Sequence, residues 1–525
     1  MKKSKVFLFL LVIAIAASPL FAAGGQESVP AASTGPVKLT ISFPSRPVFD
    51  PTQPAIQEIF KRNNVIVEVL LAENTADAKN LMFASGNLPD IFNLSFLDYL
   101  QYMSLGYFKA LDDMLPKYGP NILKNTSADG WKFMTINGKK YGYPYEANKV
   151  KHYAFARVDW IKNVGIDLSK NKDYGNFGGK EITLDQYRDM LNKFTKNNPT
   201  KTGSKTYGMG STAKKDNFSW NNIYGAFGGI PGHYYINNDK AMPWLVTDQY
   251  RKGLEYLNAL WKDGVIDPEI YLNPNDQAKQ KMINSVSGSV VGEWWSTAYT
   301  LMVDGLKALV PDAEFIPIWI TSNDGKTFGS PDNGLISTVW SISTTSKNPE
   351  KALSFMDFFN TDEGFFWAWY GLEGTDFTLN QYKLPVRTEE GLRKYNNMII
   401  DPFFGMSNRL EIQKSVAARP GLTNWTELQR QKWEILQCDN TQPTYTNAMY
   451  GIPAPKQFAE FGVDVNNWME QSAMAFVTGE VPLNDANWNN YINTWKKMGG
   501  VKILQGYVDS YNKLKGAKIT AGITE

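Results

Sequence analysis

An alternation of strand-like and helix-like segments after Val37 is the feature that most restricts how this chain can fold. A strand shows as alternating apolar and polar residues, and a helix as apolar residues spaced three or four apart. The predicted strands cover residues 37–43, 65–71 and 89–93, and the predicted helices between them cover 53–62 and 76–84. Strand, helix, strand, helix, strand is typical of a parallel sheet covered by helices, so we predict an α/β fold.

Later segments add further predicted helices and one strand of small residues. Thr183 begins a helix that extends to Thr195, because Gln186 lies three residues on and completes a capping box. Further helices are predicted over 249–263, 349–360 and 488–498, the last ended by Gly499-Gly500. The segment 287–292 reads as a strand that leads into Trp294-Trp295.

The amino terminus has the pattern of a secretory signal peptide. Three of the first five residues are lysines, a continuously apolar run covers 6–17, and a small residue allows cleavage after Ala22. A membrane-spanning helix needs roughly 20 apolar residues, so the pattern favours a cleaved signal over an anchor. The following residues, 23–36, are small and polar and read as a flexible leader.

Composition narrows the classes of function. A chain of 525 residues has room for two domains, and its formal net charge of +2 does not favour nucleic acid or an anionic membrane. The single cysteine, Cys438, excludes an internal disulfide framework, and the two histidines, His152 and His233, argue against a His-rich metal site. We therefore predict no metal and no cofactor. The 16 Trp, 26 Tyr and 29 Phe will mostly form core, but flat aromatic faces also stack on sugar rings.

Recognisable catalytic motifs are absent from the sequence. It contains no His-Glu-x-x-His, no Gly-x-Ser-x-Gly and no Walker loop, and Cys438 has no recognisable catalytic partner. Paired carboxylates for glycoside hydrolysis stay open, since their proximity is three-dimensional. We predict that the protein is not an enzyme.

Short sequence blocks provide the most specific signal. In chain order they are 84–91 (ASGNLPDI), 106–112 (GYFKALD), 118–121 (YGPN), 138–144 (GKKYGYP), 157–161 (RVDWI), 311–314 (PDAE), 370–374 (YGLEG), 451–453 (GIP) and 495–500 (WKKMGG). Together they resemble the blocks of family 1 extracellular solute-binding proteins of ABC transporters. The chain is most similar to the long subgroup that includes alginate-binding and LipO-like proteins.

This resemblance implies a periplasmic binding protein fold of type II, in which two α/β lobes are joined by a hinge and close over a ligand cleft. The expected parts are a signal peptide over 1–22, the leader over 23–36, an amino-terminal lobe over 37–148 plus 334–378, and a carboxy-terminal lobe over 149–333 plus 379–525. The implied function is to deliver an oligosaccharide to ABC permease subunits, with the protein acting as a monomer. Because no cysteine follows the predicted cleavage site, we expect a free periplasmic protein, not a lipid-anchored one.

Candidate ligand contacts are aromatic, amide or charged residues near the expected lobe crossings. They are Tyr143, Tyr145, Glu146, Asn148, Trp220, Trp294, Trp295, Trp340, Trp369, Tyr370, Glu373 and Arg46. Core packing is the alternative for Tyr143. Adjacent residues of an extended segment point in opposite directions, so one of Trp294 and Trp295 is expected to be exposed, and Trp295 is favoured.

Two other functions remain open on the sequence. A peptide-binding protein on the same scaffold would need a charge anchor such as Arg46 or Arg157, although Arg157 is favoured as a structural ion-pair residue. A secreted polysaccharide-degrading enzyme is the other alternative. Long family members often carry an Asp-rich calcium loop, whereas residues 197–205 here contain no acidic side chain, so we predict that no calcium binds there.

Overall fold

The computed structural model describes residues 35–42, 51–71, 76–103, 105–146, 152–174, 179–211, 220–270, 280–293, 300–332, 336–381, 383, 385–395 and 444–524. Val37–Glu525 form one compact unit, separate from Met1–Pro36. Among the described residues, no helix is both long enough and apolar enough to cross a membrane.

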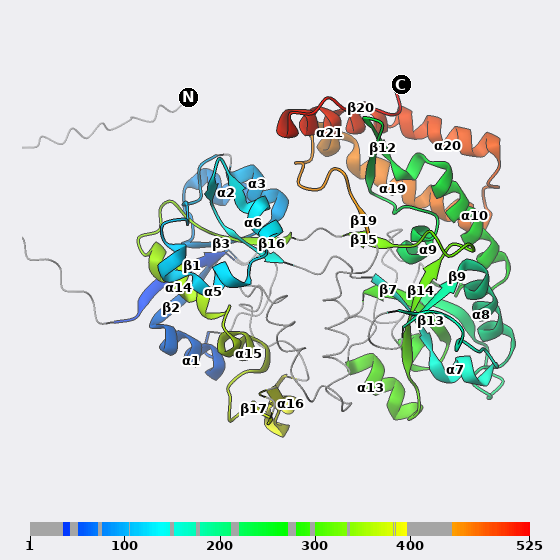
Figure 1. Ribbon diagram of the computed structural model, residues 1–525, viewed down its shortest axis with the longest axis horizontal. Helices are drawn as coiled ribbons and strands as arrows, with labels where there is room; N and C mark the ends of the chain where they lie inside the picture. Colours follow the sequence, from blue (N-terminus) through cyan, green and yellow to red (C-terminus); the bar gives the residue numbers. More distant parts are fainter. Residues whose placement is uncertain are drawn as a thin grey trace, which may run out of the picture. The chain divides into compact units, whose positions relative to one another are not determined.

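The first large sheet has five strands. In spatial order these are β2 (Val65–Leu71), β1 (Val37–Ser42), β3 (Ile91–Ser95), β16 (Ile336–Ile342) and β6 (Tyr143–Glu146) (Figure 1). β1 pairs in parallel with both β2 and β3, which confirms the predicted parallel unit. β16 is antiparallel to β3 and β6, so the complete sheet is mixed.

Helices pack around this sheet and complete the first core. They are α1 (Pro54–Asn63), α2 (Ala76–Ser85), α3 (Phe96–Met103), α4 (Leu115–Tyr118), α5 (Pro120–Asn125), α6 (Ala128–Met134), α14 (Pro349–Phe358) and α15 (Asp362–Tyr370). α1 ends where Asn64 adopts a left-handed backbone with a φ of 47°, a conformation that asparagine tolerates. The short strands β17 (Phe377–Leu379) and β18 (Pro385–Arg387) and the helix α16 (Glu389–Tyr395) follow α15, and β18 packs against it.

The second large sheet has six strands and its own core. Their order is β10 (Tyr207–Ser211), β13 (Ser287–Glu293), β7 (His152–Arg157), β14 (Phe315–Thr321), β9 (Gly179–Thr183) and β8 (Asp173–Tyr174). The small residues of β13 have a packing role: a Cβ atom at Gly288 would lie 2.1 Å from the ring of Trp160. α8 (Leu184–Lys196) covers this sheet, and its predicted capping box between Thr183 and Gln186 is confirmed.

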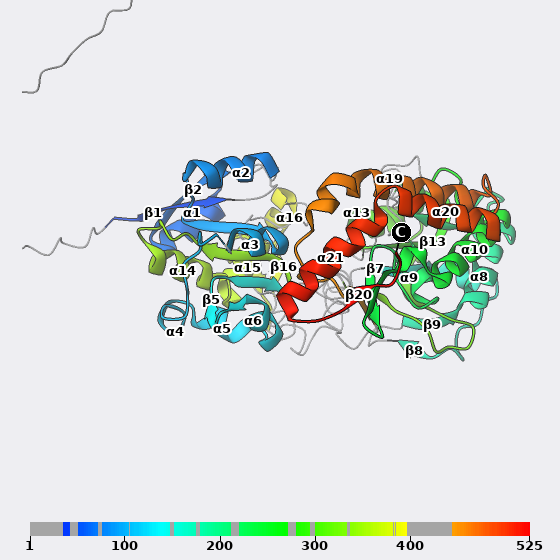
Figure 2. The ribbon, with the colours of Figure 1, turned by 90° about the horizontal axis from the view of Figure 1, so that it is seen from above.

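Further helices enlarge the second core. They are α7 (Val158–Asn163), α9 (Asn221–Gly225), α10 (Asp248–Lys262), α19 (Lys456–Thr478), α20 (Asp485–Lys497) and α21 (Gly500–Lys515). The helix α13 (Thr300–Leu309) follows β13 and precedes β14 in the chain. Figure 2 shows α19, α20 and α21, in orange to red, packed beside one another. α20 ends before the predicted glycine pair, and Gly499, with a φ of +100°, directly precedes α21.

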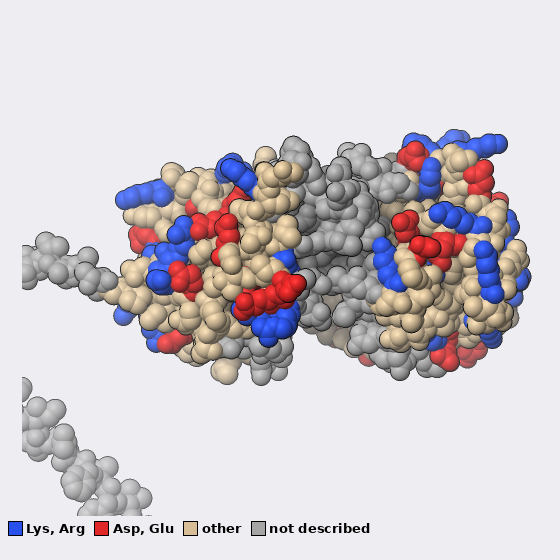
Figure 3. Space-filling view, turned by 90° about the horizontal axis from the view of Figure 1, so that it is seen from below, with Lys and Arg blue, Asp and Glu red and all other residues tan. Residues whose placement is uncertain are grey.

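Two crossover strands pair with each other outside the large sheets. β15 (Ser330–Asp332) and β19 (Thr444–Thr446) form a parallel pair, although more than a hundred residues separate them in the chain. Near them, the hairpin of β11 (Tyr234–Asn237) and β12 (Lys240–Pro243) pairs with β20 (Thr520–Ala521). On the face shown in Figure 3, basic and acidic side chains are interspersed.

Candidate functional site

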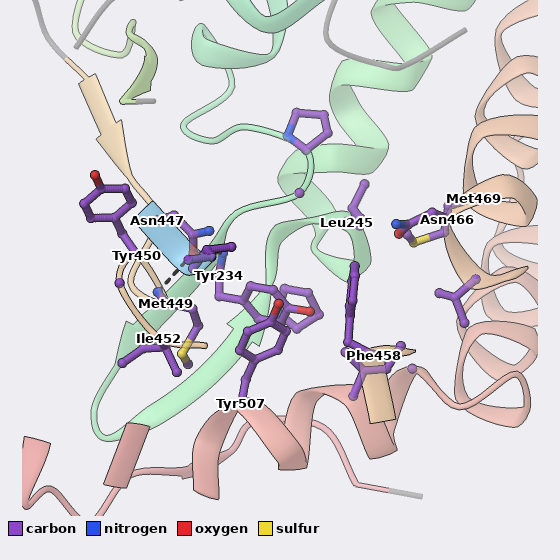
Figure 4. A pocket seen from close by; sticks show the side chains of 18 of the residues that line it. Tyr234, Leu245, Asn447, Met449, Tyr450, Ile452, Phe458, Asn466, Met469 and Tyr507 are labelled. Atoms are coloured by element: carbon purple, nitrogen blue, oxygen red, sulfur yellow. Dashed lines mark hydrogen bonds between the residues drawn. The ribbon is translucent and has the colours of Figure 1, made fainter. Parts of the chain in front are cut away.

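A cavity of about 540 Å³ lies among residues that come from both halves of the fold (Figure 4). We call it the central cavity. The first-sheet region contributes Ser95–Leu97, where β3 passes into α3, and Ile336 and Ser337 at the start of β16. The second half contributes Tyr234 and Leu245, the segment Asn447–Ile452, and residues of the last three helices, including Phe458, Met469, Glu470, Trp495 and Tyr507.

The segment Asn447–Ile452, which we call the bridging loop, forms one wall. Asn447 Oδ1 accepts hydrogen bonds from the backbone N–H groups of Tyr234 and Met449, both at 3.1 Å. The backbone N–H of Ala448 donates to the carbonyl of Tyr234 at 2.9 Å. Met449 and Ile452 are buried in the second core. These contacts fix the beginning of the loop on β11.

Tyr450 ties the same loop to the first sheet. Its hydroxyl accepts a hydrogen bond from the backbone N–H of Ile336 at 2.9 Å and donates to the carbonyl of Ile336 at 3.2 Å. Its ring centroid lies 5.6 Å from the rings of both Phe96 and Phe133. Gly451 follows with a φ of +76°, and a Cβ atom there would contact Phe96 at 3.4 Å. The loop therefore contacts both cores within a few residues.

A second group of aromatic rings in the lining comes from β11, α19 and α21. The ring of Tyr507 on α21 lies 5.1 Å from Tyr234 and 6.3 Å from Phe458, and Figure 4 shows the three rings grouped together. Burial raises the pKa of Tyr234 and of Tyr507. Both hydroxyls therefore stay protonated at neutral pH and can donate as well as accept hydrogen bonds.

Polar residues also line the cavity. Ser95, Ser337, Asn447, Asn466 and Glu470 contribute hydroxyl, amide and carboxylate groups to the lining. A cavity with apolar ring faces and a few polar groups suits a ligand that has both an apolar face and hydroxyl groups.

None of the predicted ligand contacts that the structure describes lines the central cavity. Five of them pack in the core of the first sheet, namely Tyr143, Tyr145, Trp340, Trp369 and Tyr370, and Trp220 packs in the core of the second. Tyr143 is fully buried, so it packs in the core, as the alternative interpretation of this residue expected. None of these six lines the central cavity. Their role as ligand contacts stays a prediction.

Of the remaining predicted contacts, the structure describes only Glu146 and Glu373. Glu146 is buried, and its Oε1 accepts hydrogen bonds from the backbone N–H of Ser127 at 3.0 Å and from the Ser127 hydroxyl at 2.8 Å, at the start of α6. Glu373 is exposed. Arg46, Asn148, Trp294 and Trp295 lie outside the described residues.

Arg157 is a structural ion-pair residue, as predicted. Its guanidinium is 1% exposed and donates to both carboxylate oxygens of Asp159, at 2.8 and 2.6 Å, and to Ser285 at 3.1 Å. Within the described part of the chain, no group of three or more His, Cys, Asp or Glu side chains is placed to hold a metal ion.

Sequence reasoning missed the residues that line the central cavity. Tyr234, Asn447, Tyr450 and Tyr507 were not among the predicted contacts. One signal was available, because the block Gly451-Ile452-Pro453 belongs to the family pattern and directly follows Tyr450.

Comparison with known proteins decides the family. The model of the bacterial extracellular solute-binding proteins matches residues 46–364, which is more than half of the chain. The chain belongs to this family. As a solute-binding protein, it has the two-lobed α/β fold that the resemblance implied.

Its similar proteins share less than a quarter of their residues with it, and two of them match over most of their length. The polygalacturonan/rhamnogalacturonan-binding protein YtcQ of Bacillus subtilis (strain 168) is 23% identical, over 98% of this chain and 99% of that protein. Lipoprotein LipO of the same organism is 22% identical, over 84% of each chain. Among solved structures, the alginate-binding protein AlgQ2 without calcium ion has a TM-score of 0.62 and 19% identity, covering 91% of this chain and 99% of its own.

Proposed function

We propose that this solute-binding protein captures an oligosaccharide in the central cavity and delivers it to the permease subunits of an ABC importer. The observation that carries the proposal is the lining of the cavity, which includes the rings of Phe96, Tyr234, Tyr450 and Tyr507 together with residues that bear hydroxyl and amide groups. Pyranose and furanose rings present an apolar face for stacking and hydroxyl groups for hydrogen bonding, so this lining suits them.

The names of similar proteins support the sugar class. YtcQ is named for polygalacturonan and rhamnogalacturonan, and a fructooligosaccharide-binding protein of Streptococcus pneumoniae, FusA, is 24% identical over 44% of this chain and 45% of its own. FusA also has a solved structure in complex with kestose, with a TM-score of 0.61 and 17% identity over 92% of this chain and all of that one. These proteins are binding proteins, which agrees with the absence of a recognisable catalytic motif in the sequence.

The proposed mechanism is closure of the two lobes around the solute. A ligand in the central cavity would contact Phe96 from the first half and Tyr507 from the second, so binding would stabilise the closed arrangement by its greater affinity for it. We propose that the mature protein acts as a monomer in the periplasm and is not lipid-anchored. Intact-mass measurement of the exported protein tests this point: cleavage after Ala22 without added lipid is expected, and a lipid-modified amino terminus would contradict it.

Calorimetric titration of the mature protein tests the ligand class. The panel holds kestose, oligogalacturonides, alginate oligosaccharides and a set of short peptides. At least one oligosaccharide should bind and raise the melting temperature by mass action. Binding of peptides with no response to any oligosaccharide would refute the sugar class.

A pair of tyrosines on α21 tests the place of binding. Tyr507→Ala removes a ring from the cavity wall and should weaken oligosaccharide binding at least about tenfold. Tyr511, one turn further along the same helix, does not line the cavity, so Tyr511→Ala serves as the matched control and should bind like the wild type. Equal affinity of the Tyr507→Ala variant and the wild type would place the ligand elsewhere.

A further inference from the structure

Two tyrosine hydroxyls, one just before the bridging loop and one within it, attach the chain to different parts of the molecule. Tyr445, in the crossover strand β19, donates to the carbonyl of Gly225 at 3.0 Å, at the end of α9 in the second half. Tyr450 exchanges two hydrogen bonds with the backbone of Ile336, the first residue of β16 in the first sheet. Only Tyr450 lines the central cavity.

The second attachment, from Tyr450 to Ile336, connects the bridging loop to the start of a strand in the first sheet. β15 ends at Asp332 and pairs with β19, whereas β16 begins at Ile336 in the first sheet. The segment that holds β15 and β16 and the segment that holds β19 and the bridging loop are thus joined twice, once by the β15–β19 backbone pairing and once by the side chain of Tyr450. A side chain that bonds to both the N–H and the carbonyl of one residue fixes that backbone in place.

Packing holds the Tyr450 ring in one orientation. Phe96 and Phe133 lie on two sides of it, with interplanar angles of 35° and 86°. Phe96 and Phe133 are themselves in edge contact at 5.8 Å. Meanwhile Met449, the preceding residue, is buried in the second core. Neighbouring residues of one loop are therefore anchored in different cores at the wall of the cavity.

We propose that Tyr450 is a positioning residue for solute binding: its hydroxyl fixes the bridging loop on Ile336 and thereby sets the separation of the two cavity walls. This inference rests on the proposed function, because it assigns Tyr450 a role at the same cavity. A loop that is already fixed loses less conformational freedom when a ligand binds, so the attachment increases affinity.

The test compares Tyr450→Phe with Tyr445→Phe. Each variant loses one hydroxyl and keeps its ring, and the two positions lie five residues apart in the chain. Tyr450→Phe removes both hydrogen bonds to Ile336 and should weaken binding of the best oligosaccharide by about tenfold, mainly through faster dissociation. Tyr445→Phe should bind as the wild type does. Equal or tighter binding by Tyr450→Phe, or an equal loss in both variants, would overturn the proposal.

A measurement without ligand separates this proposal from the proposed function. Spin labels at exposed Ala84 on α2 and Asn490 on α20, in a Cys438→Ser background, report the distribution of distances between the two halves. Tyr450→Phe should broaden this distribution, and Tyr445→Phe should leave it unchanged. A distribution identical to wild type in Tyr450→Phe would refute the positioning role even if no oligosaccharide bound, whereas a broadened distribution supports it whatever the ligand is.

Discussion

Replacement of Arg157 by methionine tests whether this residue supports the fold or anchors a ligand. The guanidinium is 1% exposed, donates to both oxygens of Asp159 and to Ser285, and lies 5.3 Å from the ring of Trp160. Removal of one partner from a buried ion pair costs about 3–5 kcal/mol, because the other charge remains buried. Asp159 keeps 19% exposure, so we expect the lower end, about 3 kcal/mol.

Urea unfolding followed by tryptophan fluorescence measures this loss of stability. In a thermal scan, cooperative unfolding of a chain this long would show the same loss of about 3 kcal/mol as a decrease of about 3 °C in melting temperature. Arg188→Met is the matched control, since Arg188 also forms a two-bond pair, with Asp263, but its side chain is 42% exposed. A more exposed pair contributes less than about 1 kcal/mol. Equal stability of the two variants, or loss of solute binding by a fully stable Arg157→Met, would refute the structural role.

Three further outcomes follow from local features. Thr183→Ala removes the capping box of α8 and should destabilise the protein by about 1 kcal/mol, whereas Thr183→Ser should keep most of that stability in the same urea assay. Burial lowers the pKa of His233 to about 4, so stability present above pH 6.5 should be lost as the pH falls towards 4, and His233→Gln should remove that part of the pH profile. Calcium should neither bind to the chelated protein in calorimetry nor raise its melting temperature, because the loop over 197–205 offers hydroxyl and amide groups without a carboxylate; stoichiometric binding there would contradict this.

Local patterns in the sequence predicted much of the secondary structure. The strand over 65–71 has the predicted bounds, and the helices predicted over 53–62 and 76–84 differ from α1 and α2 by about one residue at their ends. These elements depend on side-chain periodicity and capping within a few residues, which a single sequence displays. The parallel pairing of β1 with its neighbours followed from the same pattern.

Long-range features could not be obtained in this way. β16 enters the first sheet beside β3, although Asn93 and Thr338, whose side chains are hydrogen-bonded, lie 245 residues apart. The central cavity combines short segments from distant parts of the chain, and no local pattern shows that Tyr234 and Tyr507 meet. Residue type did not separate core from cavity either, because Trp340 and Tyr370 have the chemistry of a sugar contact and pack in the core.

The position of β16 within the first sheet also determines when that sheet can form during synthesis. β16 lies between β3 and β6 in the sheet. The first sheet therefore stays incomplete until residue 342 has been synthesised. Pairings between such distant segments form slowly, because a long loop must close before the contact is gained. The first sheet of the nascent chain therefore forms late, after every strand of the second sheet has already been synthesised.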